Sequence, residues 1–253
     1  MAIDFTLTSQ QRELQLESRH FAADVLAGAR AAELLPTAEE RFLATRPVYE
    51  AMVAAGFLRK CIPQPAGGEN AGLIDMAIMA EEFYSVNASV TLTMLGTVLG
   101  LLPILLGGTP EQSSRLLAPF LRKSGVPLAG FCSSEPGGSA NAASPPPGEG
   151  VRTVAKLHGD RWVINGRKKW VSSATGWDRK GADVLCVVCR TAPDTPPEKA
   201  ISIIAVERPA SGIVFERAIE SVGHRAHLTP QFGSRTFPRR GTIFSERKAA
   251  ASP

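Results

Sequence analysis

Apolar residues in the first half of the chain recur every three to four positions, the spacing of helices with one buried face. A first helix is predicted to begin after Thr8 or Ser9, whose hydroxyls can cap it, and to continue to about Leu26. Later stretches of the same pattern predict further helices over 47–55, 73–86 and 110–121. Gly56 and Gly125 follow the first and the last of these, and glycines commonly terminate helices.

The segment 88–106 carries no charged residue. Its length allows a membrane span, and that alternative stays open at this point. Serines, threonines, glycines and Pro103 interrupt the apolar run, and no basic residue stands beside its end at Gly107-Gly108. A central helix that is buried on all sides of a folded domain is the favoured interpretation.

After residue 125 the pattern changes to short apolar runs separated by turn residues, which is typical of an antiparallel β domain. Turns are expected at His158-Gly159-Asp160 and at Asn165-Gly166, because Asn-Gly is a strong hairpin signal. The strands expected between these turns cover 151–157, 161–164, 169–172, 184–189, 201–206 and 213–215.

This change of pattern predicts an α+β fold class. An N-terminal all-α domain would cover 1–126, followed by a small antiparallel β-barrel or sandwich domain over 127–232. Residues 233–253 are expected to form an atypical tail that follows the β domain without a strong helix and is basic through Arg235, Arg239, Arg240, Arg247 and Lys248.

The composition is that of an ordinary folded protein and excludes several functional classes. A net charge of +4, from 28 basic and 24 acidic residues, is too small to indicate a nucleic-acid partner. Four cysteines do not make a disulfide framework, so a reducing compartment is expected. Cys186 and Cys189 form a C-x-x-C pair within an expected strand, where residues three apart face opposite sides, so core packing is favoured over metal or redox chemistry.

Neither end of the chain carries a recognisable address. The N-terminus lacks the basic and apolar regions of a signal peptide, and Ala251-Ser252-Pro253 is not a peroxisomal tripeptide. A cytoplasmic location is expected, with a peroxisomal or mitochondrial location as the alternative. His224 and His227 lie three apart, but no third ligand is evident, so no metal site is predicted.

One loop has more small and polar residues than a simple connection needs. The apolar run 126–132 is followed by Ser133-Ser134-Glu135-Pro136-Gly137-Gly138-Ser139. Small side chains, glycines and several hydroxyls together suit the close approach of a polar ligand. A plain surface turn is the alternative reading of this loop taken alone.

A second motif follows about thirty residues later, as Asn165-Gly166-Arg167-Lys168-Lys169-Trp170-Val171-Ser172. An apolar strand that ends in Ser/Thr-Glu-Pro-x-Gly-Ser and is followed by N-G-x-K-x-W-x-[ST] resembles the middle domain of the acyl-CoA dehydrogenase superfamily. The stretches 41–47 and 176–190 most resemble the nitroalkane oxidase branch of that superfamily. The resemblance covers residues 1 to about 230.

The resemblance implies a bound FAD and gives roles to residues in both motifs. Trp170 would cover the flat flavin ring with its π surface, and Ser172, two residues on in an expected strand, would reach the polar ring edge on the same side. The remaining residues would contact the cofactor from the first motif: Phe131 lining the pocket, Ser133 and Ser134 at the pyrimidine edge, and Gly138 and Ser139 at the pyrophosphate or at substrate phosphates. The Pro136–Ser139 spacing is one residue shorter than the common acyl-CoA version.

The same resemblance implies a C-terminal helical bundle, which is absent from these 253 residues. In the family that bundle supplies the catalytic base and most contacts of a homotetramer, so no catalytic residue is assigned here. The expected function is an FAD-dependent oxidoreductase that oxidises an acyl-CoA thioester, or alternatively a nitroalkane. A catalytically incomplete, truncated remnant that binds flavin or an acyl group, or acts as a partner subunit, is the second hypothesis.

Overall fold

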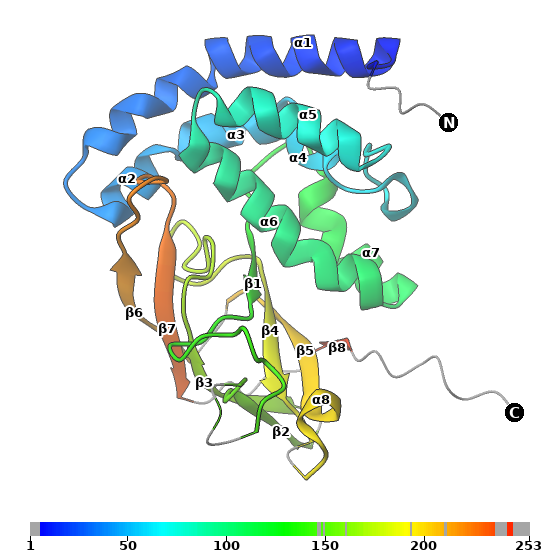
Figure 1. Ribbon diagram of the computed structural model, residues 1–253, viewed down its shortest axis with the longest axis vertical. Coiled ribbons are helices and arrows are strands. Elements are labelled where there is room, and N and C mark those ends of the chain that lie inside the picture. Colours follow the sequence, from blue (N-terminus) through cyan, green and yellow to red (C-terminus); the bar gives the residue numbers. More distant parts are fainter. Residues whose placement is uncertain are drawn as a thin grey trace, which may run out of the picture.

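This computed structural model describes residues 6–145, 148, 150–159, 161–192, 194–209, 212–235 and 242–244. Helices form one end of the molecule and a curled sheet forms the other, with β1 descending from the helices into the sheet (Figure 1). The helical part consists of α1 Ser9–Asp24, η1 Leu26–Leu34, α2 Ala38–Ala44, α3 Arg46–Ala54, α4 Phe57–Lys60, η2 Gln64–Ala66, α5 Leu73–Tyr84, α6 Ala88–Gly107, α7 Pro110–Leu117 and η3 Ala118–Leu121.

Capping residues set the starts of several helices. Thr8, Thr37 and Thr109 each accept a hydrogen bond from the backbone N–H three residues on, and the side chain at that position bonds back to the cap. These capping boxes satisfy N–H groups that have no partner within the helix. The first helix therefore begins as the sequence predicts.

α6 passes through the centre of the molecule and contacts β1. Asn87 caps it by accepting from the Val90 N–H at 2.9 Å. It is long and apolar enough to cross a membrane, but 56% of its most apolar stretch is buried within the protein. It is therefore a core helix and not a span, as the sequence favours.

Two glycines of α6 allow the sheet domain to approach the helix closely. A Cβ on Gly100 would lie 2.6 Å from the Ala129 carbonyl carbon, and a Cβ on Gly96 would lie 2.8 Å from the Ser172 Cβ. Such separations are shorter than van der Waals contact, so any larger residue would push the two layers apart. The glycines that interrupt the apolar run are thus packing positions.

In the described part of the chain the sheet has eight strands: β1 Ala129–Cys132, β2 Val154–His158, β3 Arg161–Lys168, β4 Val184–Arg190, β5 Ile201–Glu207, β6 Ile213–Ile219, β7 Thr229–Arg235 and β8 Thr242–Phe244. Their order is β6-β7-β3-β2-β4-β5-β8, with β1 beside β4, and the short helix α8 Pro197–Ala200 precedes β5. The α+β architecture is confirmed.

The sheet is mixed, because β1 and β4 run parallel. Both strands start at the helical layer, where Leu128 donates its N–H to the Asp183 carboxylate at 2.9 Å and Asp183 donates its N–H to the Leu128 carbonyl at 2.8 Å. This exchange fixes the two strands side by side in the same direction, with Phe131 opposite Cys186. The other extended pairings are antiparallel, as expected.

The predicted turn at Asn165-Gly166 is wrong, because β3 continues through both residues. Asn165 pairs with Val154 on one side and Arg235 on the other. A Cβ on Gly166 would lie 2.3 Å from the Thr153 Oγ1, so this glycine is required for close packing and not for a turn. The chain reverses at Gly159, where φ is +63°; Asp160 lies outside the described residues.

The predicted strand over 169–172 is also wrong. β3 ends at Lys168, and Trp170 and Ser173 have positive φ values of 59° and 53°. These left-handed residues turn the chain out of the sheet. Ser172 therefore does not share a strand face with Trp170.

The sheet extends past the expected domain limit at residue 232. Gly233 pairs with Arg167 and Val214, so β7 continues to Arg235, and β8 adds to the edge at β5. The rest of the predicted basic tail, 236–241 and 245–253, lies outside the described residues.

Aromatic and polar contacts join the two layers. Phe42 stacks on Trp177 with ring centroids 4.4 Å apart and an interplanar angle of 4°. The buried Tyr49 donates its hydroxyl to the Pro127 carbonyl at 2.8 Å. Since Pro127 and Trp177 flank the entries to β1 and β4, these contacts fix the position of the sheet relative to the helices.

Candidate functional site

The serine loop that follows β1 lies directly beside the end of β3. The Lys169 N–H donates to the Ser134 carbonyl at 2.9 Å, and the Lys168 ammonium donates to the Ser133 carbonyl at 3.2 Å. The two motifs that the sequence singled out are therefore hydrogen-bonded neighbours. Ser133 and Ser134 are half-buried beside the residue that precedes Trp170.

A buried ion pair fastens this junction. Glu135 and Lys168 are 5% and 2% exposed, and the Lys168 ammonium lies 2.8 Å from the Glu135 carboxylate. The same carboxylate accepts from the Arg152 N–H, the Thr153 N–H and the Thr153 hydroxyl, at 2.7, 3.0 and 2.6 Å. Buried charges are tolerated when they are paired and their remaining hydrogen-bonding capacity is filled, and both conditions are met here.

The environment of Glu135 keeps it ionised. Burial acts to raise the pKa of this carboxyl, but the Lys168 charge and the hydrogen bonds from Lys168, Thr153 and Arg152 outweigh it. The net result is a pKa below its usual value. Glu135 is thus a structural anion that ties the serine loop to β3 and to the chain before β2.

Trp170 is the aromatic residue of this junction that is open to a ligand. Its side chain is 48% exposed, and the Lys169 ammonium lies 4.1 Å from the ring centroid. A cation over a ring is attracted to the π face, so Lys169 helps to orient the indole. The exposed ring surface fits the predicted role as a cover for a flat cofactor.

Ser172 comes to the site from a turn and not from a strand. Its Cβ and Oγ would lie 2.8 and 3.0 Å from a Cβ on Gly96, so the residue packs directly against α6. The next residue, Ser173, donates its N–H to the Leu228 carbonyl at 2.8 Å. The turn places Ser172 between the sheet domain and α6, half-buried.

The other predicted residues of the first motif lie on either side of Ser133 and Ser134. Phe131 precedes them and is half-buried in β1. Ser134 and Ser139 hold the loop closed through their hydroxyls, which are 3.3 Å apart, and the Gly138 N–H donates to the Glu135 carbonyl at 2.9 Å. Gly138 also lines a cavity of about 360 Å³ beside Arg152 and Arg167, whereas Ser134, Trp170 and Ser172 are not among the residues that line it.

The residues at this junction fit an FAD on their chemistry. A flavin presents two apolar faces and one polar edge, and the junction combines a half-exposed indole with hydroxyls and backbone groups at the ends of two strands. Nothing lies within 4 Å of the place where a Gly138 Cβ would stand, so the glycine loop leaves room for close approach. Phe131, Ser133, Ser134, Gly138, Ser139, Trp170 and Ser172 remain predicted cofactor contacts.

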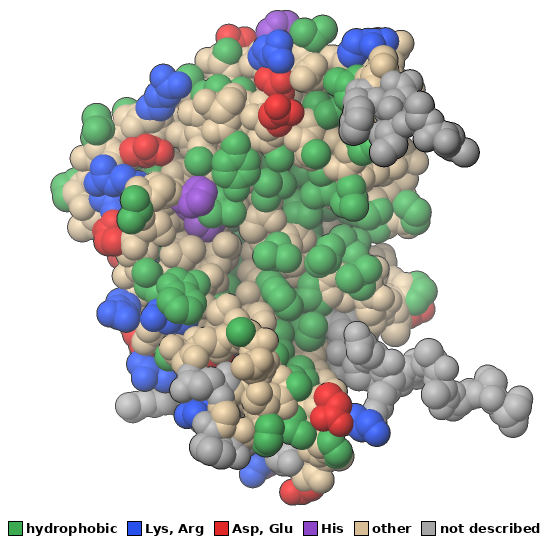
Figure 2. Space-filling model, viewed as in Figure 1, with side chains coloured by type: hydrophobic (Ala, Val, Ile, Leu, Met, Phe, Trp, Pro, Cys, Tyr) green, Lys and Arg blue, Asp and Glu red, His purple; other side chains and the backbone are tan. Residues whose placement is uncertain are grey.

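Apolar side chains gather on the face of the molecule where the helices meet the sheet (Figure 2). On α6, Leu99, Leu102 and Leu106 are 49%, 42% and 80% exposed. Their spacing of three and four residues places them on one side of the helix. A stripe of this kind marks a surface that a ligand or another protein segment covers.

Sequence reasoning missed two important residues, Glu135 and Lys168. Both belong to the quoted motifs, but a loop glutamate and a strand lysine are usually solvated. The available signal was the recurrence of Glu in one motif and Lys in the other, since a buried carboxylate needs a partner. The structure shows that this pair is what joins the two motifs.

The remaining sequence candidates have structural explanations. Cys186 and Cys189 are buried in β4, and burial raises the pKa of Cys189 to about 12, which disfavours the reactive thiolate. Within the described ranges, no three His, Cys, Asp or Glu side chains are grouped so as to hold a metal ion. His227 instead contacts Thr93 of α6, at 2.9 Å.

Comparison with known proteins agrees with this arrangement. The family model of the acyl-CoA dehydrogenase N-terminal domain matches residues 8–124, and that of the middle domain matches residues 130–232. Nitroalkane oxidase of Podospora anserina is 45% identical over 216 residues, which cover 82% of this chain and 50% of the relative. Nitroalkane oxidase of Fusarium oxysporum is 37% identical, with 81% and 49% covered.

Solved structures give the same result. A nitroalkane oxidase active-site mutant crystallised with 1-nitrohexane superimposes with a TM-score of 0.90 at 32% identity, over 96% of this chain and 60% of that one. The chain spans about half the length of the curated relatives that it matches. Two matched domains in chain order, at this identity, show that the chain belongs to the acyl-CoA dehydrogenase family.

Proposed function

We propose that this chain forms the flavin-binding part of an FAD-dependent oxidoreductase of the acyl-CoA dehydrogenase type, with a nitroalkane as the favoured substrate class. Two nitroalkane oxidases are the relatives that support the substrate class. A cyclohexene-carbonyl-CoA dehydrogenase, 28% identical, and a human short-chain acyl-CoA dehydrogenase, 30% identical, keep an acyl thioester as the alternative substrate.

One observation carries the proposal: the two motifs meet at the Glu135–Lys168 pair. The bond from the Lys169 N–H to the Ser134 carbonyl then places the loop serines next to Trp170. An aromatic ring, hydroxyls and backbone groups come together at this junction, and Ser172 joins it from beside Gly96 of α6. This combination suits a ligand with a flat apolar ring system and a polar edge.

Four residues of the junction have distinct parts in binding the cofactor. Trp170 covers a face of the ring system, Ser133 and Ser134 bind its polar edge, and Ser172 completes that edge from the α6 side. FAD, when bound, supplies the acceptor for the electrons that leave the substrate. The residues described here hold and orient the cofactor and exclude water from one side of it.

The test is a titration of the purified 253-residue chain with FAD, followed by visible absorbance. Binding is expected to perturb the flavin bands, and Trp170→Ala is expected to weaken it. Anaerobic addition of the 1-nitrohexane anion, whose α-proton has already been removed, should bleach the bands of the loaded protein, whereas a short-chain acyl-CoA should not. Absence of any FAD binding by the folded chain would refute the proposal.

A second function, flavin binding without turnover, is favoured by the state of the carboxylate at the junction. Glu135 is committed to Lys168 and three further donors. It is therefore not free to act as a base. If FAD binding perturbs the flavin bands but neither the 1-nitrohexane anion nor acyl-CoA bleaches them, this second function is identified.

A further inference from the structure

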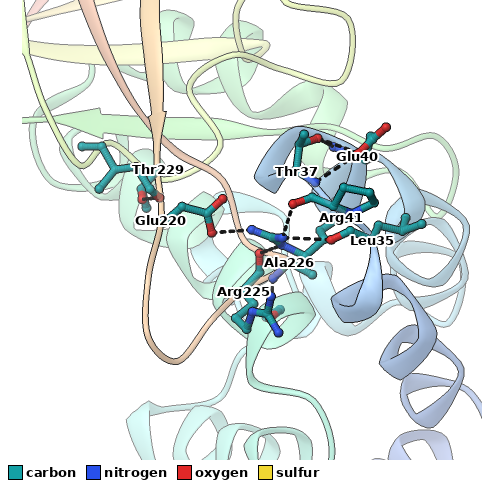
Figure 3. A network of polar contacts seen from close by, with 11 residues as sticks. Leu35, Thr37, Glu40, Arg41, Glu220, Arg225, Ala226 and Thr229 are labelled. Carbon is teal, nitrogen blue, oxygen red and sulfur yellow. Dashed lines mark hydrogen bonds and ion pairs between the residues drawn. The ribbon is translucent and has the colours of Figure 1, made fainter.

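The segment 225–228, between β6 and β7, is held at every residue by a different partner. Figure 3 shows the guanidinium of Arg41, from α2, reaching both this segment and Glu220. Its remaining nitrogen, Nη1, donates to the Leu35 and Pro36 carbonyls. The four contacts are Arg41 Nε to the Arg225 carbonyl at 2.9 Å, the Ala226 N–H to Ser89 Oγ at 3.2 Å, the His227 ring to Thr93 Oγ1 at 2.9 Å, and the Ser173 N–H to the Leu228 carbonyl at 2.8 Å.

The direction of the Thr93–His227 hydrogen bond depends on the tautomer of the imidazole. When the Thr93 hydroxyl donates its single proton to the Ser89 carbonyl, 3.0 Å away, Thr93 accepts from His227 and the imidazole carries its proton on Nδ1. Nε2 is then an unprotonated acceptor, and it is buried without a partner in a residue that is 2% exposed.

His227 and Ser172 both lie beside Gly96 of α6, and Ser173 is hydrogen-bonded to Leu228, the residue after His227. The His227 Cε1, which is bonded to Nε2, would lie 4.0 Å from a Cβ on Gly96, and the Ser172 Oγ would lie 3.0 Å from the same point. The Ser173 Oγ is also buried and has no partner. Buried polar atoms normally find partners, so these groups call for an explanation.

We propose that His227 is a positioning residue for the Ser172–Ser173 turn, with its unprotonated Nε2 accepting a hydrogen bond from a hydroxyl of that turn and so fixing the direction of Ser172 toward a bound cofactor. The inference deepens the proposed function, because it rests on Ser172 as a cofactor contact. It assigns a role to the segment 225–228, which brings the imidazole to the turn.

Two substitutions test the roles of the two ring nitrogens of His227 separately. Asparagine retains a donor at the position of Nδ1 and can keep the contact to Thr93, whereas glutamine retains an acceptor at the position of Nε2. We expect His227→Asn to weaken FAD binding about fivefold to tenfold, the effect of one lost hydrogen bond, and His227→Gln to restore most of the affinity. If His227→Asn binds FAD as tightly as the wild type and His227→Gln does not, only the contact to Thr93 matters and the proposal is overturned.

Two further readouts need no flavin, so failure of the proposed function leaves this inference testable. Imidazole nitrogen NMR of the apo chain should show one histidine protonated on Nδ1 alone. Hydrogen exchange of the Ser173 N–H should be about tenfold faster in His227→Asn than in the wild type, since loss of one hydrogen bond frees the turn. An Nε2–H tautomer, or equal exchange in both proteins, overturns the proposal. Ser172→Ala and Ser173→Ala, compared in the same assay, identify the hydroxyl that donates.

Discussion

Trp170 presents a half-exposed indole at the junction of the serine loop and β3, and its left-handed backbone turns the ring away from the sheet. Removing the ring should leave the fold intact, because about half of the side chain is already exposed to solvent. We predict that Trp170→Ala weakens FAD binding about tenfold, as expected for a lost aromatic stacking contact. Trp170→Phe should retain most of the affinity.

Absorbance titration measures this effect, and the midpoint of urea unfolding serves as the control. A large drop in that midpoint would show that Trp170 is a core residue, contrary to the role argued here. Trp177 provides the contrast, since it is buried against Phe42 and donates its indole N–H to the Val126 carbonyl at 2.8 Å. Trp177→Phe should lower stability while leaving the candidate site in place.

The contribution of the sequence at this scale was the identity of the residues and not their geometry. Both motifs lie where the pattern indicates, yet Ser172 reaches the site through a turn. The left-handed conformation of Trp170 and Ser173 is set by tertiary contacts, such as the bond from Ser173 to Leu228, which local propensity does not encode. Gly166 failed as a turn signal because of a tertiary contact too: Thr153 packs against it and leaves no room for a side chain at position 166.

At the scale of elements, the Glu135–Lys168 pair joins the loop after β1 to the end of β3. We predict that Lys168→Met lowers the free energy of unfolding by about 3–5 kcal/mol, because it leaves a buried carboxylate without its counter-ion. Arg167→Met is the matched control, since the neighbouring Arg167 forms an exposed pair with Glu216 and should change stability little. Urea unfolding of both variants measures the difference.

The double variant Glu135→Gln/Lys168→Met supplies the next comparison. Removing both charges together should cost less than Lys168→Met alone, because no unpaired ion remains. Equal losses in Lys168→Met and Arg167→Met would show that the buried pair does not hold the junction. The sequence places Glu135 and Lys168 in the two motifs but does not pair them, since they are 33 positions apart and their burial arises only in the folded chain.

The contact between α6 and the turn that carries Ser172 depends on Gly96. Alanine is the better helix former, but its Cβ would stand 2.8 Å from the Ser172 Cβ. We predict that Gly96→Ala lowers stability by about 1–3 kcal/mol, the usual effect of overpacking, and weakens FAD binding by displacing Ser172. In Gly28→Ala, the control in η1, the added Cβ meets nothing within 4 Å, so stability should not fall.

For the whole molecule, the junction between the helices and the sheet gives stability a specific pH dependence. Burial, with a smaller contribution from His224, lowers the pKa of His227 from 6.5 to about 3 in the folded protein. As the pH falls below 6.5, the unfolded chain binds a proton that the folded chain rejects. Stability from this residue is therefore complete above pH 6.5 and is lost progressively between pH 6.5 and 3.

The contribution of His227 to the pH dependence of stability can be isolated by comparing the wild type with His227→Gln, which has no titrating ring. The charged groups near the ring stay the same in both proteins: His224, Glu33 on the Ser89 hydroxyl, and Arg41 on the Arg225 carbonyl. Between pH 6.5 and 4 the wild type should lose up to about 1.4 kcal/mol more per pH unit than the variant, which corresponds to one proton. Glu135 adds acid sensitivity only below its unfolded pKa of 4.5, so it does not obscure the upper part of this window. Parallel curves of unfolding free energy against pH in the two proteins would mean that the imidazole is not buried in a neutral state, and the packing of 225–228 against α6 described here would be incorrect.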